Sequence, residues 1–501
     1  MIYHCEDHTC NYWDEGEKLP ERCPQCGRKL LRANEADMTG DDWTALGNTL
    51  WDAEASDKKR MVDCFRKAAY LGSAWGVCNL GICMEQGNGV EADPVQAFWL
   101  YQQAVEMGSL NAVCCLGVCY QYGIGTAPDA KQAAELYCKA AEYGSPRGQM
   151  LLARAFHDGI GVEADAAEAV HWVRAAAYQR YGEGMHRLGV CYAYGDGVEQ
   201  NWEHAVHWFR EAAESGVSAA MTDLGYCYEK GCGVEQSWEQ AFSWYRRGAE
   251  CGYPVSMSNL GLCYKRGYGV EQNWQEAIKW YEQGAQCGDL QSMNNLAYCY
   301  ERGEGVEQNE DRALYWYRRG AEAGSDYCMY CLGWNYSNGE GVEQNMTEAI
   351  RWYTAAAEGG NADAMHDLGW LYDHGEGVEQ DMKKAICWYE RAAEQNYPAA
   401  MNSLGECYAM GRGVPRDLET AMEWYRRAAE LGEAMADYNM GWHLEQAGKL
   451  SEAYAHYRKA ADGNDDSAWW ALGRFYENGV VVAQDGKEAR RCYETGEKLG
   501  S

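Results

Sequence analysis

The sequence has 501 residues, of which 57 are glycine, 8 proline and 23 cysteine, and its 44 basic and 76 acidic residues leave a net charge of −32. This acidity excludes a general nucleic-acid coat and disfavours binding to anionic membranes, because both need a basic face. The sequence contains no run of about 18 apolar residues, the length that is needed to span a bilayer. The first residues lack the basic and apolar segments of a signal peptide, so we expect a cytoplasmic protein.

Residues 1–32 contain four cysteines that stand apart from the others. Cys23 and Cys26 are separated by two residues, a spacing that lets two thiolates bind one ion, and tetrahedral thiolate coordination suits zinc. A segment of about 30 residues needs such a metal to fold. It resembles a small zinc ribbon of the rubredoxin type, although His8 could replace one of the first two cysteines, and iron or a metal-free segment are alternatives. The expected ligands of one structural zinc are Cys5, Cys10, Cys23 and Cys26.

From residue 40 onward the sequence repeats itself, mostly with a period of 36 residues. The most regular feature is a Leu-Gly pair, for example at 188–189 and 224–225; we call its leucine the repeat leucine. A fixed period of this length is typical of proteins built from stacked helical units. After a linker at 33–39, units begin near residues 40, 74, 110, 146, 182, 218, 254, 290, 326, 362, 398, 434 and 466.

The sequence pattern within each unit predicts two helices. Apolar residues recur at helical spacing around the repeat leucine, as in Met221, Leu224 and Tyr228. A Gly-x-Gly-Val loop follows, since glycine readily adopts the left-handed conformation that ends a helix. An Ala-x-x-Trp pattern, such as Ala241 with Trp244, then predicts the second helix. Because a lone helix pair cannot bury its apolar stripe, we expect neighbouring pairs to stack.

The complete unit reads Leu-Gly-x-x-Tyr, Gly-x-Gly-Val, Ala-x-x-Trp-Tyr and Ala-Ala-x-x-Gly, and over residues 40–501 it resembles the Sel1-like repeat, a relative of the tetratricopeptide repeat. The resemblance implies an all-α fold, a right-handed α-solenoid of about thirteen helix-turn-helix repeats behind the ribbon. The first unit lacks the Gly-x-Gly loop, and the unit near residue 434 replaces it with Gln-Ala-Gly-Lys. Atypical end units are expected in such arrays.

The resemblance further implies that the first helices line a concave groove that binds a protein or peptide. Asn and Asp recur immediately before the repeat leucine, and aromatic residues recur two positions after it. Asn can hydrogen-bond an extended backbone, and exposed Trp and Tyr offer contact area at low entropic cost. The acidic charge favours a polar or basic partner. The candidate groove residues are Asn79, Asp223, Tyr226, Asn259, Asn295, Tyr298, Arg302, Tyr330, Trp334, His366, Asp367, Trp370, Asn439 and Trp442.

The nineteen cysteines outside the ribbon are expected mainly as small buried residues, because many, such as Cys227 and Cys263, stand three residues after the repeat leucine. Secreted, cysteine-rich Sel1-like proteins of one bacterial group resemble this chain but carry paired cysteines for disulfides, a pattern that is absent here. Their hydrolase or penicillin-binding activity is one alternative function, and a nucleic-acid-associated adaptor acting through the ribbon is another. No serine-hydrolase, phosphate-loop or zinc-protease motif occurs, so we expect a non-catalytic scaffold or adaptor.

Overall fold

The computed structural model describes residues 2–5, 13–15, 30–32, 35–51 and 55–500. Near the N-terminus three short strands, β1 (Ile2–Cys5), β2 (Trp13–Glu15) and β3 (Leu30–Arg32), form an antiparallel sheet in the order β2–β1–β3. The side chains expected to bind zinc lie outside the part of the chain whose side chains are described; they are Cys5, His8, Cys10, Cys23 and Cys26.

The remainder of the described chain is helical. A short 3-10 helix (Glu35–Asp37) precedes 26 α-helices, which form thirteen successive pairs and confirm the predicted α-solenoid. The first helices of these pairs are α1 (Gly40–Thr49), α3 (Ala74–Gln86), α5 (Leu110–Tyr122), α7 (Pro146–Asp158), α9 (Gly182–Tyr194), α11 (Ser218–Lys230), α13 (Pro254–Arg266), α15 (Leu290–Arg302), α17 (Asp326–Asn338), α19 (Ala362–His374), α21 (Pro398–Met410), α23 (Ala434–Gln446) and α25 (Asp466–Asn478).

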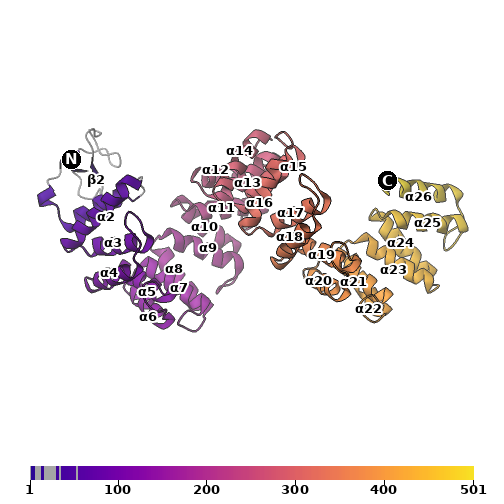
Figure 1. The fold of residues 1–501 in the computed structure, drawn as a ribbon, viewed down its shortest axis with the longest axis horizontal. Coiled ribbons are helices and arrows are strands. Elements are labelled where there is room, and N and C mark those ends of the chain that lie inside the picture. Colours follow the sequence, from indigo (N-terminus) through magenta and orange to yellow (C-terminus); the bar gives the residue numbers. More distant parts are fainter. Residues whose placement is uncertain (1, 6–12, 16–29, 33–34, 52–54, 501) are drawn as a thin grey trace. The chain divides into compact units, whose positions relative to one another are not determined.

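The helices are grouped in two compact units, residues 1–256 with 268–270 and residues 257–267 with 271–501. Within a unit, a first helix packs on the second helix of its own repeat and on that of the preceding repeat, as α9 does on α10 and α8 (Figure 1). The second helices are α2 (Ala55–Tyr70), α4 (Pro94–Glu106), α6 (Ala130–Glu142), α8 (Ala166–Tyr178), α10 (Trp202–Glu214), α12 (Trp238–Glu250), α14 (Trp274–Gln286), α16 (Glu310–Glu322), α18 (Met346–Glu358), α20 (Met382–Glu394), α22 (Leu418–Glu430), α24 (Leu450–Asp462) and α26 (Gly486–Leu499).

The helix ends follow capping chemistry that is visible in the sequence. At the start of α15 the Asp289 carboxylate accepts a hydrogen bond from the Ser292 amide, and at its end Gly303 adopts a left-handed conformation with φ of 70°. The next helix begins at Asn309, whose side-chain oxygen accepts from the Arg312 amide. Each cap satisfies a backbone group that the helix leaves without a partner. The same signals therefore set the boundaries in repeat after repeat.

The glycine of the Leu-Gly pair lets the two helices of a repeat approach closely. A Cβ at Gly225 would lie 2.6 Å from Cε1 of Tyr245, a ring that is 1% exposed. The Tyr245 hydroxyl donates to the Glu229 carboxylate at 2.9 Å, which satisfies the one polar atom of this core side chain. The tyrosine that follows the second-helix tryptophan is therefore the larger core residue of the unit, and equivalent tyrosines are buried along the array.

Replacing Gly161 with alanine should be far more destabilising than replacing Gly144. Both glycines have positive φ, 69° and 80°, where alanine is strained by about 1 kcal/mol. A Cβ at Gly161 would also meet the backbone carbonyl of Ala130, whereas nothing lies within 4 Å of one at Gly144. We expect Gly161→Ala to lower the unfolding free energy by about 3 kcal/mol and Gly144→Ala by about 1 kcal/mol. Urea unfolding followed by circular dichroism measures both, and equal losses would contradict the packing argument.

Candidate functional site

Side chains beside the repeat leucines connect the first helices of neighbouring repeats. The residue two positions before one repeat leucine contacts the residue one position before the next. Tyr330 donates its hydroxyl to the Asp367 carboxylate at 3.2 Å, and His186 Nε2 lies 2.7 Å from the Asp223 carboxylate. Burial, with the Asp367 charge, raises the pKa of Tyr330, so its hydroxyl remains a donor at neutral pH. These expected groove residues thus also tie adjacent repeats together.

Asparagines also connect adjacent first helices. Asn439 Nδ2 donates to Asn402 Oδ1 at 2.9 Å in the same relation, whereas Asn79 Nδ2 donates at 2.8 Å to Oδ1 of Asn48, two positions after the first repeat leucine. His366 adds a further bridge, with Nδ1 at 3.2 Å from the Asp367 carboxylate and Nε2 at 3.4 Å from the hydroxyl of the following repeat's serine. The remaining candidates at this level are half-buried, namely Asn259 and Asn295.

Aromatic side chains two positions after the repeat leucine are exposed in the second unit. Trp334, Trp370 and Trp442 keep 44%, 40% and 38% of their surface exposed. The Trp370 ring stacks on His374 with 4.2 Å between ring centroids, which holds the indole in one orientation. We call these three tryptophans together with Tyr298 the tryptophan face. Tyr226, at the same position in the first unit, is 43% exposed.

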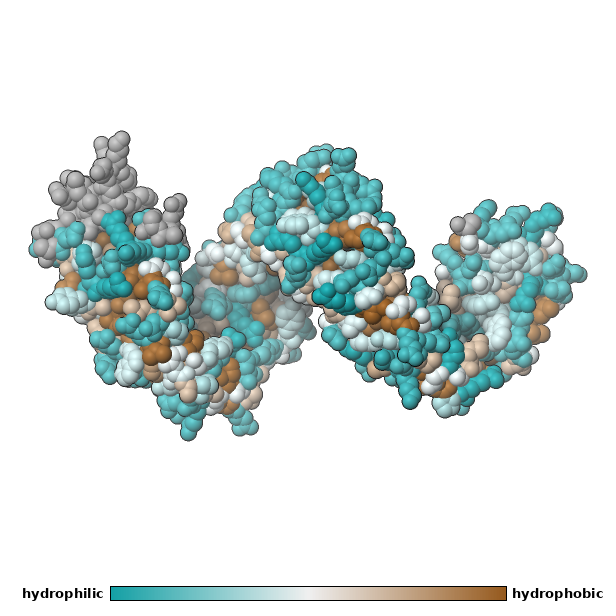
Figure 2. All heavy atoms as spheres, viewed as in Figure 1, coloured by the Kyte–Doolittle hydropathy of each residue, from teal (hydrophilic) through white to brown (hydrophobic). Residues whose placement is uncertain are grey.

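Four consecutive first helices of the second unit, α17, α19, α21 and α23, contain carboxylates but neither lysine nor arginine. A surface charge of one sign attracts a partner of the other sign and speeds its association. Figure 2 shows that hydrophilic residues dominate the visible surface, with hydrophobic residues in small separate patches. The seven acidic residues of these helices are Asp326, Asp363, Asp367, Asp373, Glu406, Asp437 and Glu445.

The helices α13 and α15, unlike the four acidic first helices that follow them, carry lysine and arginine. Lys265 Nζ lies 3.0 Å from the Glu304 carboxylate and 4.8 Å from the centroid of the Tyr298 ring, while the Arg302 guanidinium lies 5.8 Å from that centroid. A cavity of about 540 Å³ opens here, lined in part by Trp274 and Asn295. The aromatic residues of the second unit thus run from a basic end at α15 to an acidic stretch over α17–α23.

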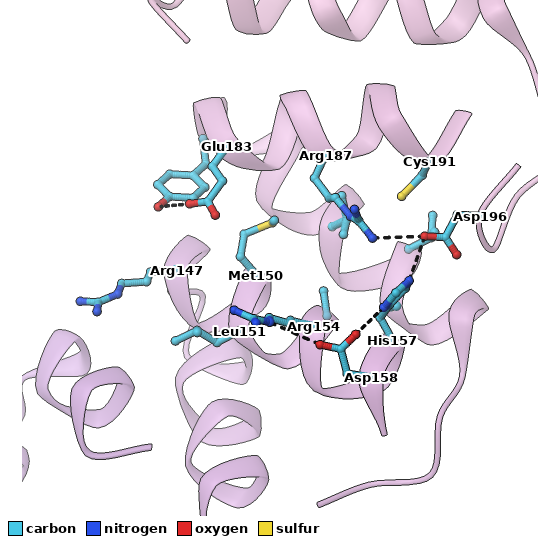
Figure 3. Close-up of a pocket in the computed structure, with 15 residues that line it drawn as sticks. Arg147, Met150, Leu151, Arg154, His157, Asp158, Glu183, Arg187, Cys191 and Asp196 are labelled. Carbon is cyan, nitrogen blue, oxygen red and sulfur yellow. Dashed lines mark hydrogen bonds and ion pairs between the residues drawn. The ribbon is translucent and has the colours of Figure 1, made fainter. Parts of the chain in front are cut away.

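The first unit has its own cavity, of about 450 Å³, between α7, α8 and α9 (Figure 3). Its wall includes the apolar side chains of Met150, Leu151, Val170 and Val173. This volume and mixture of apolar and polar residues are typical of a small ligand or side-chain pocket. None of the candidate groove residues lines it.

Charged groups form a continuous network at one side of this cavity, as the dashed lines of Figure 3 show. Arg154 Nε lies 3.3 Å from the Asp158 carboxylate, which is 2.6 Å from His157 Nδ1. His157 Nε2 then reaches Asp196 at 3.4 Å, and Arg187 Nη2 contacts the same carboxylate at 3.2 Å. The sequence analysis did not predict this pocket; the basic residues at 154 and 187, beside the repeat leucines of two adjacent repeats, are the signal that could have indicated it.

Among the described residues, no group of three or more His, Cys, Asp or Glu side chains is placed to hold a metal ion. All nineteen cysteines there are free thiols, and most are buried. Burial raises the pKa of Cys83 to about 11 and that of Cys227 to about 12, so these thiols stay protonated and inert at neutral pH. No helix in the described ranges is long and apolar enough to cross a membrane.

Thirteen stacked helix pairs with exposed polar and aromatic side chains on the first helices place this molecule among the α-solenoid repeat proteins. The chain belongs to the Sel1 repeat family. The family model, described as "Sel1 repeat", matches twelve segments, at residues 76–109, 112–145, 146–181, 182–217, 218–253, 254–289, 290–325, 326–361, 362–397, 398–433, 434–465 and 468–501.

Two solved structures are similar to this chain. A protective antigen present in uropathogenic Escherichia coli strains, which displays an SLR fold, is 32% identical; the match covers 87% of this chain and 94% of that chain with a TM-score of 0.51. A Sel1 repeat protein from Oxalobacter formigenes is 31% identical, covering 49% of this chain and 96% of that chain with a TM-score of 0.44. A search of curated proteins finds no match.

Proposed function

We propose that this protein is a non-catalytic scaffold that binds an extended, basic segment of a partner protein on the tryptophan face. The observation that carries the proposal is the combination, on four consecutive first helices without lysine or arginine, of three exposed tryptophans with five half-buried carboxylates. Exposed, oriented indoles are the residue type that dominates binding energy at protein interfaces. The five carboxylates supply charge complementarity to lysine and arginine, whereas Asp373 and Asp437 are buried and do not face a partner.

The spacing of the tryptophan face suggests the conformation of the bound segment. Trp334 and Trp370 occupy equivalent positions on adjacent first helices, which the hydrogen bond from Tyr330 to Asp367 holds in side-chain contact. A polyproline II segment has about three residues per turn, so its side chains at every third position lie on one face. Such a face would present apolar side chains to both indoles, and aromatic grooves are a common receptor for this conformation.

Selection of peptides from a random library on the full chain tests the proposal. The selected peptides should be rich in lysine and arginine, with apolar or proline residues three positions apart. Their affinity should fall as the salt concentration rises, because part of the attraction is electrostatic. Selection of acidic peptides, or binding that is indifferent to salt, would contradict it.

A cytoplasmic location fits this function and the thiol chemistry. The described part of the chain carries nineteen free thiols. Free thiols in such number persist in a reducing compartment, whereas secreted proteins of this composition pair them as disulfides. The proposal therefore places the scaffold, without enzymatic activity, in the cytoplasm.

We also propose that the N-terminal segment holds one structural zinc ion. The donor set of Cys5, Cys10, Cys23 and Cys26, with His8 as an alternative, is one that zinc prefers. Metal analysis of the purified chain should find about one zinc per molecule. The double variant Cys23→Ser, Cys26→Ser should lose it, while Cys251→Ser, which removes an exposed thiol elsewhere, should keep it. Zinc retained by the double variant, or iron in its place, would refute the assignment.

A further inference from the structure

Cys78 and Cys115 occupy a place in the first unit where other repeats put a hydrogen-bonded pair. Cys78 stands two positions before one repeat leucine, and Cys115 one position before the next, the same relation as that of Tyr330 to Asp367. Here both side chains are short thiols, near enough to influence each other's ionisation, and Asn111 contacts one sulfur while Arg147 contacts the other. The helices that carry them, α3 and α5, are also in contact. Proximity of this kind is required before two cysteines can form a disulfide.

Two polar side chains, one from α5 and one from α7, contact the sulfurs of this pair. Arg147 at the start of α7 donates from Nη1 to Asn111 Oδ1 at 2.6 Å and to Cys115 Sγ at 3.6 Å. Asn111 in turn donates from Nδ2 to Cys78 Sγ at 3.7 Å. Arg147 also lines the cavity of Figure 3, where its guanidinium points to the side away from Arg187 and His157. The guanidinium is therefore committed to the thiol pair and not to the charged network around His157.

These surroundings make Cys115 different from the other buried thiols. The hydrogen bond from Cys78 and the positive charge of Arg147 lower the pKa of Cys115 to about 7, against the effect of burial. The same hydrogen bond raises the pKa of Cys78, so Cys78 keeps its proton while Cys115 loses its own. Cys119, one helical turn away on α5, has a pKa raised to about 12 by burial and stays a thiol. A thiolate beside a protonated thiol is the arrangement that reacts with oxidants.

We propose that Cys78 and Cys115 are a modification site that hydrogen peroxide converts to a disulfide between adjacent repeats. The Cys115 thiolate attacks one peroxide oxygen, the O–O bond breaks, and with one proton taken up a water molecule leaves, which produces a sulfenic acid on Cys115. The Cys78 sulfur then attacks that sulfur, the S–O bond breaks, and hydroxide departs as water with the Cys78 proton. The two sulfurs lose two electrons, and one peroxide is reduced to two waters.

Peptide mapping of the full, reduced chain tests whether peroxide forms the disulfide between Cys78 and Cys115. The protein is treated with a small excess of hydrogen peroxide, its remaining thiols are blocked with N-ethylmaleimide, and it is digested without reductant for mass spectrometry. We expect the Cys78–Cys115 cross-link in most molecules and blocked, unoxidised Cys83 and Cys119 as controls from the same two helices. A free Cys115, a Cys115 oxidised to sulfinic acid, or a link from Cys115 to another cysteine would overturn the proposal.

Two variants separate this chemistry from a purely structural role. Cys78→Ala should leave the sulfenic acid of Cys115 without a resolving thiol, so that dimedone labels it at alkaline pH, where Cys115 ionises without the hydrogen bond from Cys78. Cys119→Ser should react as the unmodified chain does. The oxidation rate should rise with pH through about 7, because only the thiolate attacks, and Arg147→Gln should move that midpoint upward by removing the positive charge. An unchanged midpoint, or no dimedone adduct on Cys115, would refute the role assigned to the pair.

Discussion

Replacing Trp334 and Trp370 together with alanine should weaken the binding of a selected basic peptide by at least about 100-fold. Each indole is at least 40% exposed, and truncating a tryptophan that is a hot spot of an interface costs about 2 kcal/mol or more. Neither ring belongs to the core, so thermal unfolding of the double variant should change little. Fluorescence anisotropy with a labelled peptide measures the affinity, and circular dichroism checks the fold.

Trp99 provides a matched control for this experiment. It is 66% exposed and lies on α4, a second helix of the first unit and outside the tryptophan face. Trp99→Ala removes an indole of comparable or greater exposure and should leave the affinity for the peptide unchanged. If the double variant binds as tightly as the unmodified chain, or if Trp99→Ala weakens binding equally, the tryptophan face is not the binding surface.

Arg412→Ala should lower the unfolding free energy by about 3 kcal/mol, because it removes both ion pairs of this guanidinium, to Asp373 at 3.0 Å and to Glu406 at 3.5 Å. Asp373 on α19 is 4% exposed, and Arg412, which follows α21, places Nη1 3.0 Å from its carboxylate. Removing the guanidinium leaves the buried carboxylate without a partner. The free-energy cost of that unpaired charge exceeds the net stabilisation that the ion pair contributes. Urea unfolding at neutral pH measures the loss.

Two further variants test whether the buried charge is the cause. Replacing Asp373 and Arg412 together with leucine removes both charges and should recover most of the stability. Arg426→Ala breaks contacts of 2.6 and 2.8 Å to Glu423 and Glu430, but all three side chains are more than half exposed. This control should change stability far less than Arg412→Ala does, because an exposed ion pair is screened by water. Equal losses in Arg412→Ala and Arg426→Ala would show that burial does not matter here.

Local signals in the sequence were enough to predict the helices and their order. The turn glycines, such as Gly303, lie where the structure ends its first helices, and repeat leucines such as Leu224 are buried. The sequence pattern did not identify the tyrosines as core residues, because the tryptophan that precedes each of them is the more regular feature of the second helix. Tyr245 is buried against Gly225 of the first helix, a contact between residues about twenty positions apart that no helical period reveals.

The candidate surface was only partly predictable for the same reason. The exposed positions of Trp334 and Trp370 follow from their spacing after the repeat leucine. Whether a neighbouring side chain is free for a partner depends on the next repeat, as with Tyr330, whose hydroxyl reaches Asp367 across 37 residues. The cavity between α7 and α9 likewise needs the packing of three helices and has no counterpart in any one segment.

The repeat, the solenoid and its acidic charge could thus be inferred from residues 40–501 alone, because periodicity, caps and composition act within about 36 residues of chain. The meeting of Cys78 with Cys115, and the Arg147 guanidinium that distinguishes them from the other buried thiols, depends on three first helices coming together. Cysteines have similar sequence surroundings in many repeats. Their reactivity is set by charge and hydrogen bonding in space, which the stacking of neighbouring repeats creates.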